Sequence, residues 1–269
     1  MANFDVSRRF GGVGRVYGKN ALARFQAARV CVVGIGGVGS WAAEALARSA
    51  VGKIVLIDLD MIAESNVNRQ IHALDDAFGQ AKVALMAGRL QAIHPGCEIE
   101  AIEDFAAPDN LDSLFGGNFD CIIDAIDNAR TKAAIIAWCK ERAIPVVTAG
   151  GAGGRIDPAR VGIDDLSRVF QDPLLSSVRT RLRRERGFPR GTKKFGVPAV
   201  FSSEPVWRPR GEEEDAPCPA KPASGLNCAG YGSSVCVTAV FGFFAASEAL
   251  RCVALKKSGG VPGSMKMER

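Results

Sequence analysis

The glycine-rich segment GIGGVG at residues 34–39 constrains the fold more than any other feature of this chain. It follows the apolar run RVCVV at 29–33, which predicts a buried strand, and it opens a segment at 37–50 that predicts a helix. Glycines at this turn let the backbone approach a phosphate, whose charge then meets the N–H groups and the positive end of the helix. The segment therefore predicts a nucleotide site, formed by Gly34, Gly36, Gly37 and Gly39.

The rest of the chain continues this alternation of strand and helix patterns. Strands are expected at 53–57, 98–102, 121–125, 145–148 and 197–202, and helices at 80–93 and 130–142. Such a β-α-β order predicts an α/β protein with a Rossmann-like, mostly parallel sheet and helices on both faces. Residues 204–232 contain five prolines and predict a long irregular loop, and 233–256 predict an apolar C-terminal helix.

That last helix raises the question of a membrane. Residues 231–247 carry no charge, but this run of 17 residues is shorter than the roughly 20 needed to span a bilayer. A buried core helix is the favoured interpretation, and peripheral membrane contact is the alternative. The eight cysteines form no C-x-x-C pair and the chain opens without a secretory signal, so we expect a cytoplasmic protein with no structural zinc.

Charge is concentrated in one segment. Residues 178–194 hold six Arg and two Lys against one Glu, a local balance of +7, so the remaining residues sum to −2 of the total of +5. This distribution fits a nucleic-acid contact, and it also fits a solvated helix face followed by a loop.

Further polar blocks follow the glycine-rich turn. Asp58 ends the next predicted strand, where a carboxylate can accept a hydrogen bond from a ribose hydroxyl. This fingerprint alone suits NAD-dependent oxidoreductases as well as enzymes that use ATP. Arg69 and Lys82 favour the second reading, because a triphosphate needs cations, and Asp127 could hold the accompanying Mg²⁺.

In these blocks the chain resembles the ubiquitin-activating-enzyme-like adenylating superfamily, of the ThiF and MoeB type. Within it the likeness is to the tRNA threonylcarbamoyladenosine dehydratases, carried by CVVGIGGVGSWAAEAL at 31–46, NRQIHAL at 68–74 and AGGAGGRIDP at 149–158. The resemblance implies ATP-dependent cyclisation of N6-threonylcarbamoyladenosine at tRNA position 37 through an acyl adenylate, with loss of water. It implies that ATP and Mg²⁺ are bound by Asp58, Asp60, Ser65, Asn66, Asn68, Arg69, Lys82, Asp127 and Asn128, together with the four glycines.

The resemblance also implies partners. It predicts a homodimer in which an N-terminal arginine, Arg9 or Arg15, reaches the ATP of the other subunit. Cys228 could serve thioester chemistry or a sulfur-relay protein, while DNA is not an expected partner. Residues 1–160 are expected to form the ATP-binding core with an N-terminal helical segment, and 161–269 to contact tRNA. The basic residues expected to contact tRNA are Arg179, Arg183, Arg186, Arg190, Lys193 and Lys194.

Two other functions share parts of this pattern. An activator of a ubiquitin-like sulfur carrier would use the same ATP residues, but such proteins usually carry two zinc-binding C-x-x-C pairs, which this chain lacks. An NAD-binding oxidoreductase would leave Lys82 and Asp127 unexplained. His72 is expected to be a structural or capping residue, and His94 to end a helix.

Overall fold

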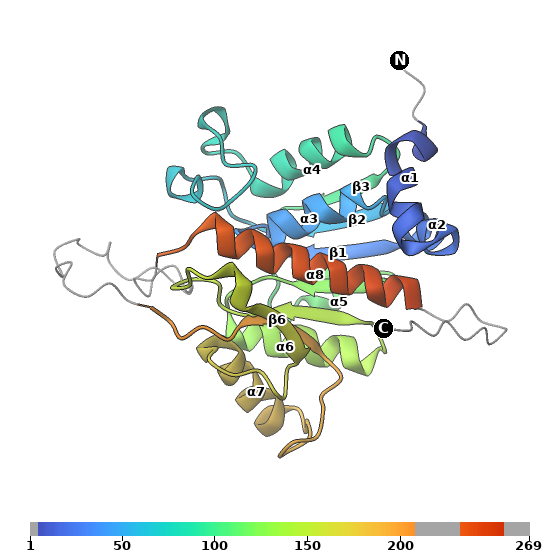
Figure 1. Ribbon diagram of the computed structural model, residues 1–269. Coiled ribbons are helices and arrows are strands. Elements are labelled where there is room, and N and C mark those ends of the chain that lie inside the picture. Colours follow the sequence, from blue (N-terminus) through green and yellow to red (C-terminus); the bar gives the residue numbers. More distant parts are fainter. Residues whose placement is uncertain (1–4, 208–231, 256–269) are drawn as a thin grey trace.

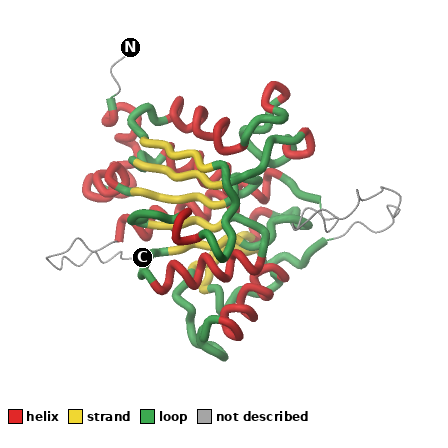
Figure 2. Tube along the Cα trace, turned by 180° about the vertical axis from the view of Figure 1, so that it is seen from behind, coloured by secondary structure: helices red, strands yellow, loops and turns green. Residues whose placement is uncertain are grey.

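The computed structural model describes residues 5–207 and 232–255, which form an α/β fold around one seven-stranded sheet. Figure 2 shows the strands side by side, with helices in front of and behind them. The strands are β1 (Arg29–Val33), β2 (Lys53–Ile57), β3 (Glu98–Ile102), β4 (Cys121–Asp124), β5 (Val146–Ala149), β6 (Val161–Asp165) and β7 (Pro198–Ser202).

The order of the strands places a crevice beside the glycine-rich turn. The sheet runs β3-β2-β1-β4-β5-β7-β6, and every neighbouring pair is parallel except β6 and β7. From β1 the chain first builds the sheet in one direction, through β2 and β3, and then returns to place β4 on the other side of β1. At such a reversal the loops that follow the two central strands diverge, and ligands bind between them.

Helices cover both faces of the sheet (Figure 1). Along β1, Val30 and Val32 face a core shared with α2, α3, α4 and α8, whereas Cys31 and Val33 face a core shared with α5, α6 and α7. A strand buried on both faces explains the unbroken apolar run in the sequence. The helices are α1 (Val6–Tyr17), α2 (Lys19–Ala27), α3 (Gly39–Arg48), α4 (Lys82–Ile93), α5 (Leu111–Leu114), α6 (Ala129–Glu141), α7 (Pro173–Glu185) and α8 (Val235–Leu255), with 3₁₀ turns η1 (Glu64–Asn66), η2 (Asp75–Ala77) and η3 (Pro158–Arg160).

The apolar C-terminal helix belongs to the core. By length and composition alone α8 could cross a membrane, and it is the one such helix among residues 5–207 and 232–255. In the fold it lies along α3 and packs on β4, β5, β6 and β7 (Figure 1). A Cβ on Gly242 would lie 2.5 Å from the carbonyl oxygen of Val38 and 2.8 Å from Cβ of Trp41. The glycine therefore permits the close contact between the two helices.

The predicted fold class is confirmed, and the differences are local. The helix expected at 37–50 is shorter, because α3 ends at Arg48 and Ala50 adopts a φ of 66°. Strand β6 was not expected, since two of the five residues of its sequence VGIDD are acidic and only its first residue is buried. Cys236 is exposed in the first turn of α8, although the run around it is apolar.

Two glycine substitutions test the packing of α8. Gly242→Ala should lower the free energy of unfolding by about 1 to 2 kcal/mol, because the clash with α3 outweighs the better helix propensity of alanine. Gly88→Ala in α4 is the matched control, since a Cβ there meets nothing within 4 Å. It should raise stability by about 0.5 to 1 kcal/mol. Urea denaturation measures both, and equal effects of the two substitutions would contradict the close packing of α8.

Candidate nucleotide site

The glycine-rich turn between β1 and α3 has the geometry of a phosphate loop. Gly34 has a φ of 88°, and a Cβ on Gly39 would lie only 1.8 Å from the carbonyl oxygen of Gly34. These two glycines are needed for the turn itself. A Cβ on Gly36 would meet nothing within 4 Å, so this stretch of backbone borders open space. The N-cap residue of α3, Val38, has no side-chain acceptor for the first N–H groups of the helix. The first N–H groups of the helix can therefore meet an anion there.

Asp58, directly after β2, holds this turn in place. Its Oδ2 accepts a hydrogen bond from the backbone N–H of Ile35 at 2.6 Å, and its Oδ1 accepts one from the N–H of Asp60 at 2.8 Å. Burial raises the pKa of this carboxyl, and the positive charge of Lys82 opposes that shift. A carboxylate has about four lone-pair positions, so Asp58 keeps capacity for a further donor such as a ribose hydroxyl.

The two predicted cations lie at the same end of the sheet. Lys82 begins α4, is buried, and its Nζ donates to Oδ2 of Asp60 at 2.7 Å. The side chain of Arg69 packs over the glycine-rich turn, so that a Cβ on Gly37 would lie 3.0 Å from its Cγ. Arg69 thus lies over the turn, and Lys82 lies beside the two carboxylates that follow β2, Asp58 and Asp60.

The segment around Arg69 is held by hydrogen bonds. Arg69 Nη1 donates to the carbonyl of Ser65 at 2.6 Å, and Trp41 Nε1 donates to the carbonyl of Arg69 at 2.9 Å. Buried Asn66 accepts from the N–H of Ala63 at 3.1 Å and so closes η1. Asn68 donates to the carbonyl of Ser233 at 2.8 Å, which ties this segment to the start of α8. Within the described residues, Ser65, Asn66 and Asn68 therefore hold the segment that carries Arg69 in place.

The loop that follows β4 lies against the glycine-rich turn. The N–H of Ala125 donates to the carbonyl of Val33 at 2.9 Å, and a Cβ on Gly34 would lie 3.0 Å from the carbonyl carbon of Ala125. Asp127 is exposed in this loop. The side-chain oxygen of Asn128 accepts from the N–H groups of Arg130 and Thr131 and so caps α6. Asn128 is thus a helix cap, and the carboxylate is the charged group of the loop.

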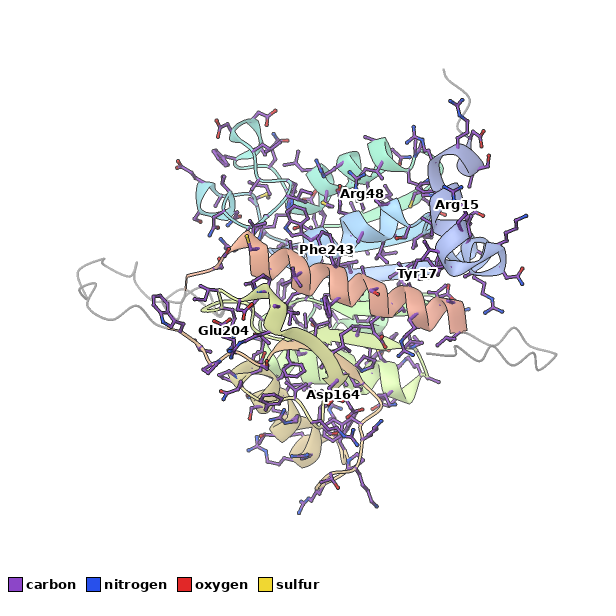
Figure 3. All side chains as sticks on the ribbon, viewed as in Figure 1. Arg15, Tyr17, Arg48, Asp164, Glu204 and Phe243 are labelled. Carbon is purple, nitrogen blue, oxygen red and sulfur yellow. The ribbon has the colours of Figure 1, made fainter. Side chains whose placement is uncertain are left out.

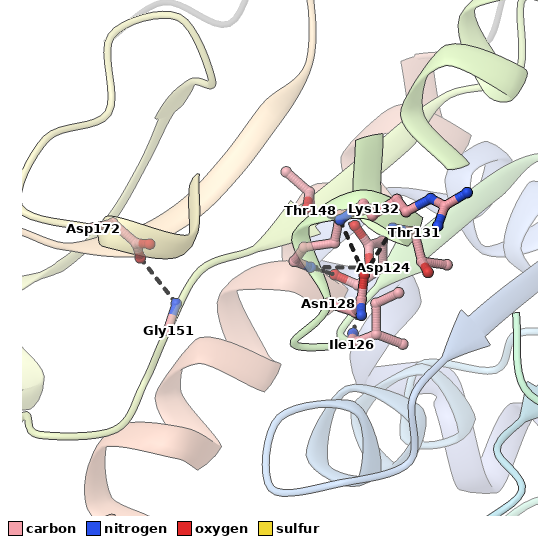
Figure 4. A network of polar contacts seen from close by, with 9 residues as sticks. Asp124, Ile126, Asn128, Thr131, Lys132, Thr148, Gly151 and Asp172 are labelled. Atoms are coloured by element: carbon pink, nitrogen blue, oxygen red, sulfur yellow. Dashed lines mark hydrogen bonds and ion pairs between the residues drawn. The ribbon is translucent and has the colours of Figure 1, made fainter. Parts of the chain in front are cut away.

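A buried polar cluster beneath this loop was not anticipated from the sequence. Asp124, Lys132 and Thr148 are each 0% exposed. Lys132 Nζ donates to Oδ1 of Asp124 at 2.9 Å and to its carbonyl at 3.1 Å, and Thr148 Oγ1 donates to Oδ2 at 2.8 Å (Figure 4). The sequence feature that could have indicated this cluster is Lys132 itself, which lies among the apolar residues of α6.

The N-terminal arginines lie away from these loops. Helices α1 and α2 flank the beginning of β1, at the opposite end of the sheet from the residues 58–81 (Figure 1). Arg9 Nη1 donates to the carbonyl of Ile93 at 2.6 Å, at the end of α4. Arg15 is exposed near the end of α1. Neither arginine joins the candidate site of its own chain.

The basic segment is likewise displaced from the glycine-rich turn. The N-cap of α7 is Asp172, which accepts from the N–H of Gly151 in the loop after β5 (Figure 4). From there the helix runs about 20 Å. Residues 186–196 then lead into β7, which is parallel to β5, so they lie at the opposite end of the sheet from the glycine-rich turn.

Two of the predicted tRNA contacts already have partners within the chain. The guanidinium of Arg179 donates to the carbonyl of Val169, and that of Arg183 donates to the carbonyls of Pro189 and Gly191 at 3.3 and 3.2 Å. Arg186 ends α7. The other predicted contacts, Arg186, Arg190, Lys193 and Lys194, are exposed.

The histidines are structural. His94 ends α4, as predicted. His72 is buried, and neither of its ring nitrogens has a hydrogen-bond partner within the described part of the chain, so it is not a cap. Burial, together with the positive charges of Lys82 and Arg89, lowers the pKa of His72 from 6.5 to about 4. Cys228, the candidate reactive thiol, lies outside the described residues. Within residues 5–207 and 232–255, no three His, Cys, Asp or Glu side chains cluster as a metal site.

These features together describe a site for a polyanion with a sugar. Backbone N–H groups, Arg69 and Lys82 are donors, Asp58 offers an acceptor at the end of β2, and Asp127 offers an exposed carboxylate. The family model of the ThiF family matches residues 8–266. The chain belongs to the ThiF family.

Relatives and solved structures extend the match over nearly the whole chain. This ThiF-family protein is 45% identical over 261 residues to the tRNA threonylcarbamoyladenosine dehydratase of Haemophilus influenzae, covering 96% of this chain and 98% of that protein. It is 48% identical over 250 residues to the Escherichia coli enzyme of the same name, covering 91% and 92%. The crystal structure of the E. coli enzyme in complex with ATP matches with a TM-score of 0.83 and 45% identity, covering 94% and 97%.

The depressed pKa of His72 predicts a pH dependence of stability. The unfolded chain takes up a proton on this residue below pH 6.5, whereas the folded protein does so only below about pH 4. Between these values the unfolded state binds the extra proton, so acid favours unfolding. The free energy of unfolding should fall by about 3 kcal/mol from pH 6.5 to 4 through this residue alone. His72→Leu should remove that part of the slope in urea titrations at each pH. Equal slopes in both proteins would show that the buried ring is not the cause.

Proposed function

We propose that this protein uses ATP to dehydrate N6-threonylcarbamoyladenosine in tRNA to its cyclic form, with release of AMP and pyrophosphate. One observation carries the proposal: the glycine-rich turn, Arg69 and the loop with Asp127 meet at the strand reversal between β1 and β4, and Lys82 pairs with Asp60 after the neighbouring strand β2. The names of the relatives supply the substrate, and the crystal structure of the E. coli enzyme with ATP supports the same co-substrate here.

The residues divide the binding of ATP among them. The backbone N–H groups around Gly36 and at the start of α3 donate hydrogen bonds to the phosphates, and Asp58 accepts one from a ribose hydroxyl. Lys82 and Arg69 place positive charge beside the phosphates, where charge builds up in the transition state. Asp60 orients Lys82 through the ion pair of 2.7 Å.

The chemistry asks little of acid or base residues. The threonyl carboxylate of the substrate is ionised at neutral pH, so it attacks the α-phosphate without a general base, and pyrophosphate leaves. A nitrogen of the same threonylcarbamoyl group then attacks the activated carbonyl carbon, closes a five-membered ring and expels AMP, whose phosphate can accept the proton that the nitrogen loses. Because the nucleophile is tethered, ring closure needs no enzyme thioester. The protein supplies electrostatic stabilisation and orientation.

The donor set fits a magnesium ion that accompanies ATP. One carboxylate together with phosphate oxygens and water is the arrangement that Mg²⁺ prefers, and Asp127 is an exposed carboxylate beside the proposed phosphate site. When bound, the ion would neutralise phosphate charge and help pyrophosphate to leave. Asn128 lies next to it but is occupied as the cap of α6.

The basic segment supports a contact with the body of the tRNA. Arg186, Arg190, Lys193 and Lys194 are exposed and lie at the end of the sheet away from the glycine-rich turn. An RNA phosphate bound there belongs to a part of the molecule distant from the reacting nucleoside. We propose that residues 1–160 bind ATP and that residues 161–269 carry this contact.

A homodimer would complete the site. Because α1 lies at the far end of its own sheet, an N-terminal arginine can meet ATP only in a partner subunit. Arg9 already donates to the end of α4, which leaves exposed Arg15 as the stronger candidate. A role of Cys228 in a sulfur relay remains a separate proposal, which ring closure does not require.

Asp127→Ala tests the proposed function. With ATP, Mg²⁺ and tRNA that carries the modification, AMP release should fall by at least about 100-fold, since one group that stabilises phosphate charge is lost. The melting temperature should change little, because the carboxylate is exposed.

Asp164→Ala is the matched control. This aspartate is also exposed, but it lies on the edge strand β6 (Figure 3). The control should keep the rate of the unmodified enzyme. Retention of half that rate by Asp127→Ala at saturating Mg²⁺ would remove Asp127 from the mechanism.

The tRNA contact predicts a salt dependence. Reversal of Arg190, Lys193 and Lys194 to Glu should raise the KM for tRNA and reduce the log–log salt slope of binding by roughly two to three units, at about 0.7 to 0.9 per phosphate contact. ATP affinity should stay constant. Arg179→Glu should instead lower stability, because this guanidinium holds the carbonyl of Val169. A triple reversal with unchanged KM and salt slope would assign the segment to the solvated surface.

A further inference from the structure

The loop that carries Asp127 is fixed by buried groups that do not themselves reach the nucleotide. It leaves β4 at Asp124 and enters α6 after Asn128, and both ends are tied. At its end, Asn128 caps the helix. At its beginning, the carboxylate of Asp124 is enclosed at 0% exposure and accepts from Lys132, Thr148 and the N–H of Ile126.

Lys132 joins the two ends of the loop. It lies one turn into α6, and its backbone N–H donates to the carbonyl of Asn128 at 2.9 Å. Its Nζ reaches back to the carbonyl of Asp124 at 3.1 Å and to Oδ1 at 2.9 Å. The next peptide group donates from Ala125 to the carbonyl of Val33, beside the glycine-rich turn. The lysine thus couples the position of the loop to that of the turn.

Thr148 adds a third element. It belongs to β5, pairs with Asp124 across the sheet, and donates its hydroxyl to Oδ2 at 2.8 Å. Figure 4 shows the three side chains meeting beside the loop, with Asn128 and Ile126 drawn below Asp124. A buried ion pair alone contributes little net stability, and such groups can instead select one conformation. Here the conformation selected is that of the loop.

From this arrangement we infer that Asp124, Lys132 and Thr148 are positioning residues that hold Asp127 in register with the glycine-rich turn. The cluster also balances charge, since Lys132 neutralises Asp124 and leaves the exposed carboxylate of Asp127 as the anionic group of the loop. The inference rests on the proposed function, because Asp127 is taken to bind Mg²⁺ with ATP.

Thr148→Val carries the test. Loss of Lys132 would strand a buried charge and endanger the fold, whereas valine keeps the shape of threonine and removes one hydrogen bond to a charged acceptor. The Mg²⁺ concentration for half-maximal AMP release should rise several-fold and kcat should fall roughly tenfold. In calorimetry, affinity for Mg²⁺ with a non-hydrolysable ATP analogue should fall in parallel. Thr148→Ser should restore both readouts.

Thr238→Val is the control for loss of a buried threonine hydroxyl. Thr238 in α8 is buried, and its Oγ1 has no hydrogen-bond partner within the described residues, so activity and Mg²⁺ dependence should stay constant. Asp124→Asn is a second test variant, which keeps the side-chain shape but leaves buried Lys132 without its counterion, so it is assayed only below its melting temperature. It should shift Mg²⁺ dependence in the same direction as Thr148→Val.

Two outcomes separate this inference from the proposed function. If Thr148→Val and Asp124→Asn lower the melting temperature but leave Mg²⁺ dependence, analogue affinity and kcat unchanged below it, the cluster only stabilises the fold and the inference is wrong. If the Asp127→Ala variant keeps its activity, the proposed role of Asp127 in binding Mg²⁺ with ATP is wrong, whatever the cluster does.

Discussion

The contact between the loops that follow β1 and β4 is the constraint on which the rest of the structure depends. Gly39 lies so close to the carbonyl of Gly34 that no side chain fits, and Ala125 is hydrogen-bonded to Val33 across the strand reversal. This contact brings a helix N-terminus and an acidic loop to one place. A nucleotide that contacts both must bind between β1 and β4. The groups that bind its ribose and phosphates must therefore lie around this point.

The surrounding elements serve to hold that contact. Asp58 ties the glycine-rich turn to the end of β2, and Asn68 ties the segment with Arg69 to the start of α8. Helix α8 in turn packs on α3 through Gly242, so the C-terminal helix closes the same layer that presents the turn. The apolar character of α8 follows from this position and needs no membrane.

The features that depend on a local sequence pattern could be predicted from the sequence. The turn, the parallel strands and the cations Arg69 and Lys82 each carry a short-range signal, and the structure places Arg69 over the turn and Lys82 against Asp60 after β2. The features that depend on contacts between distant parts of the chain could not be predicted in this way. The enclosure of Asp124 by Lys132 joins residues of β4 and α6, and Arg179 is occupied by a carbonyl ten residues earlier in the chain. The distance of the basic segment from the turn follows from the strand order, which periodicity does not reveal.

The most direct test of the account is the fate of the modified nucleoside. Purified protein should be incubated with ATP, Mg²⁺ and tRNA that carries threonylcarbamoyladenosine, and the digested nucleosides analysed by mass spectrometry. The account predicts a nucleoside lighter by one water molecule, formed with one AMP and one pyrophosphate and absent when ATP is omitted. Loss of water without ATP, or AMP release with the nucleoside unchanged, would contradict it.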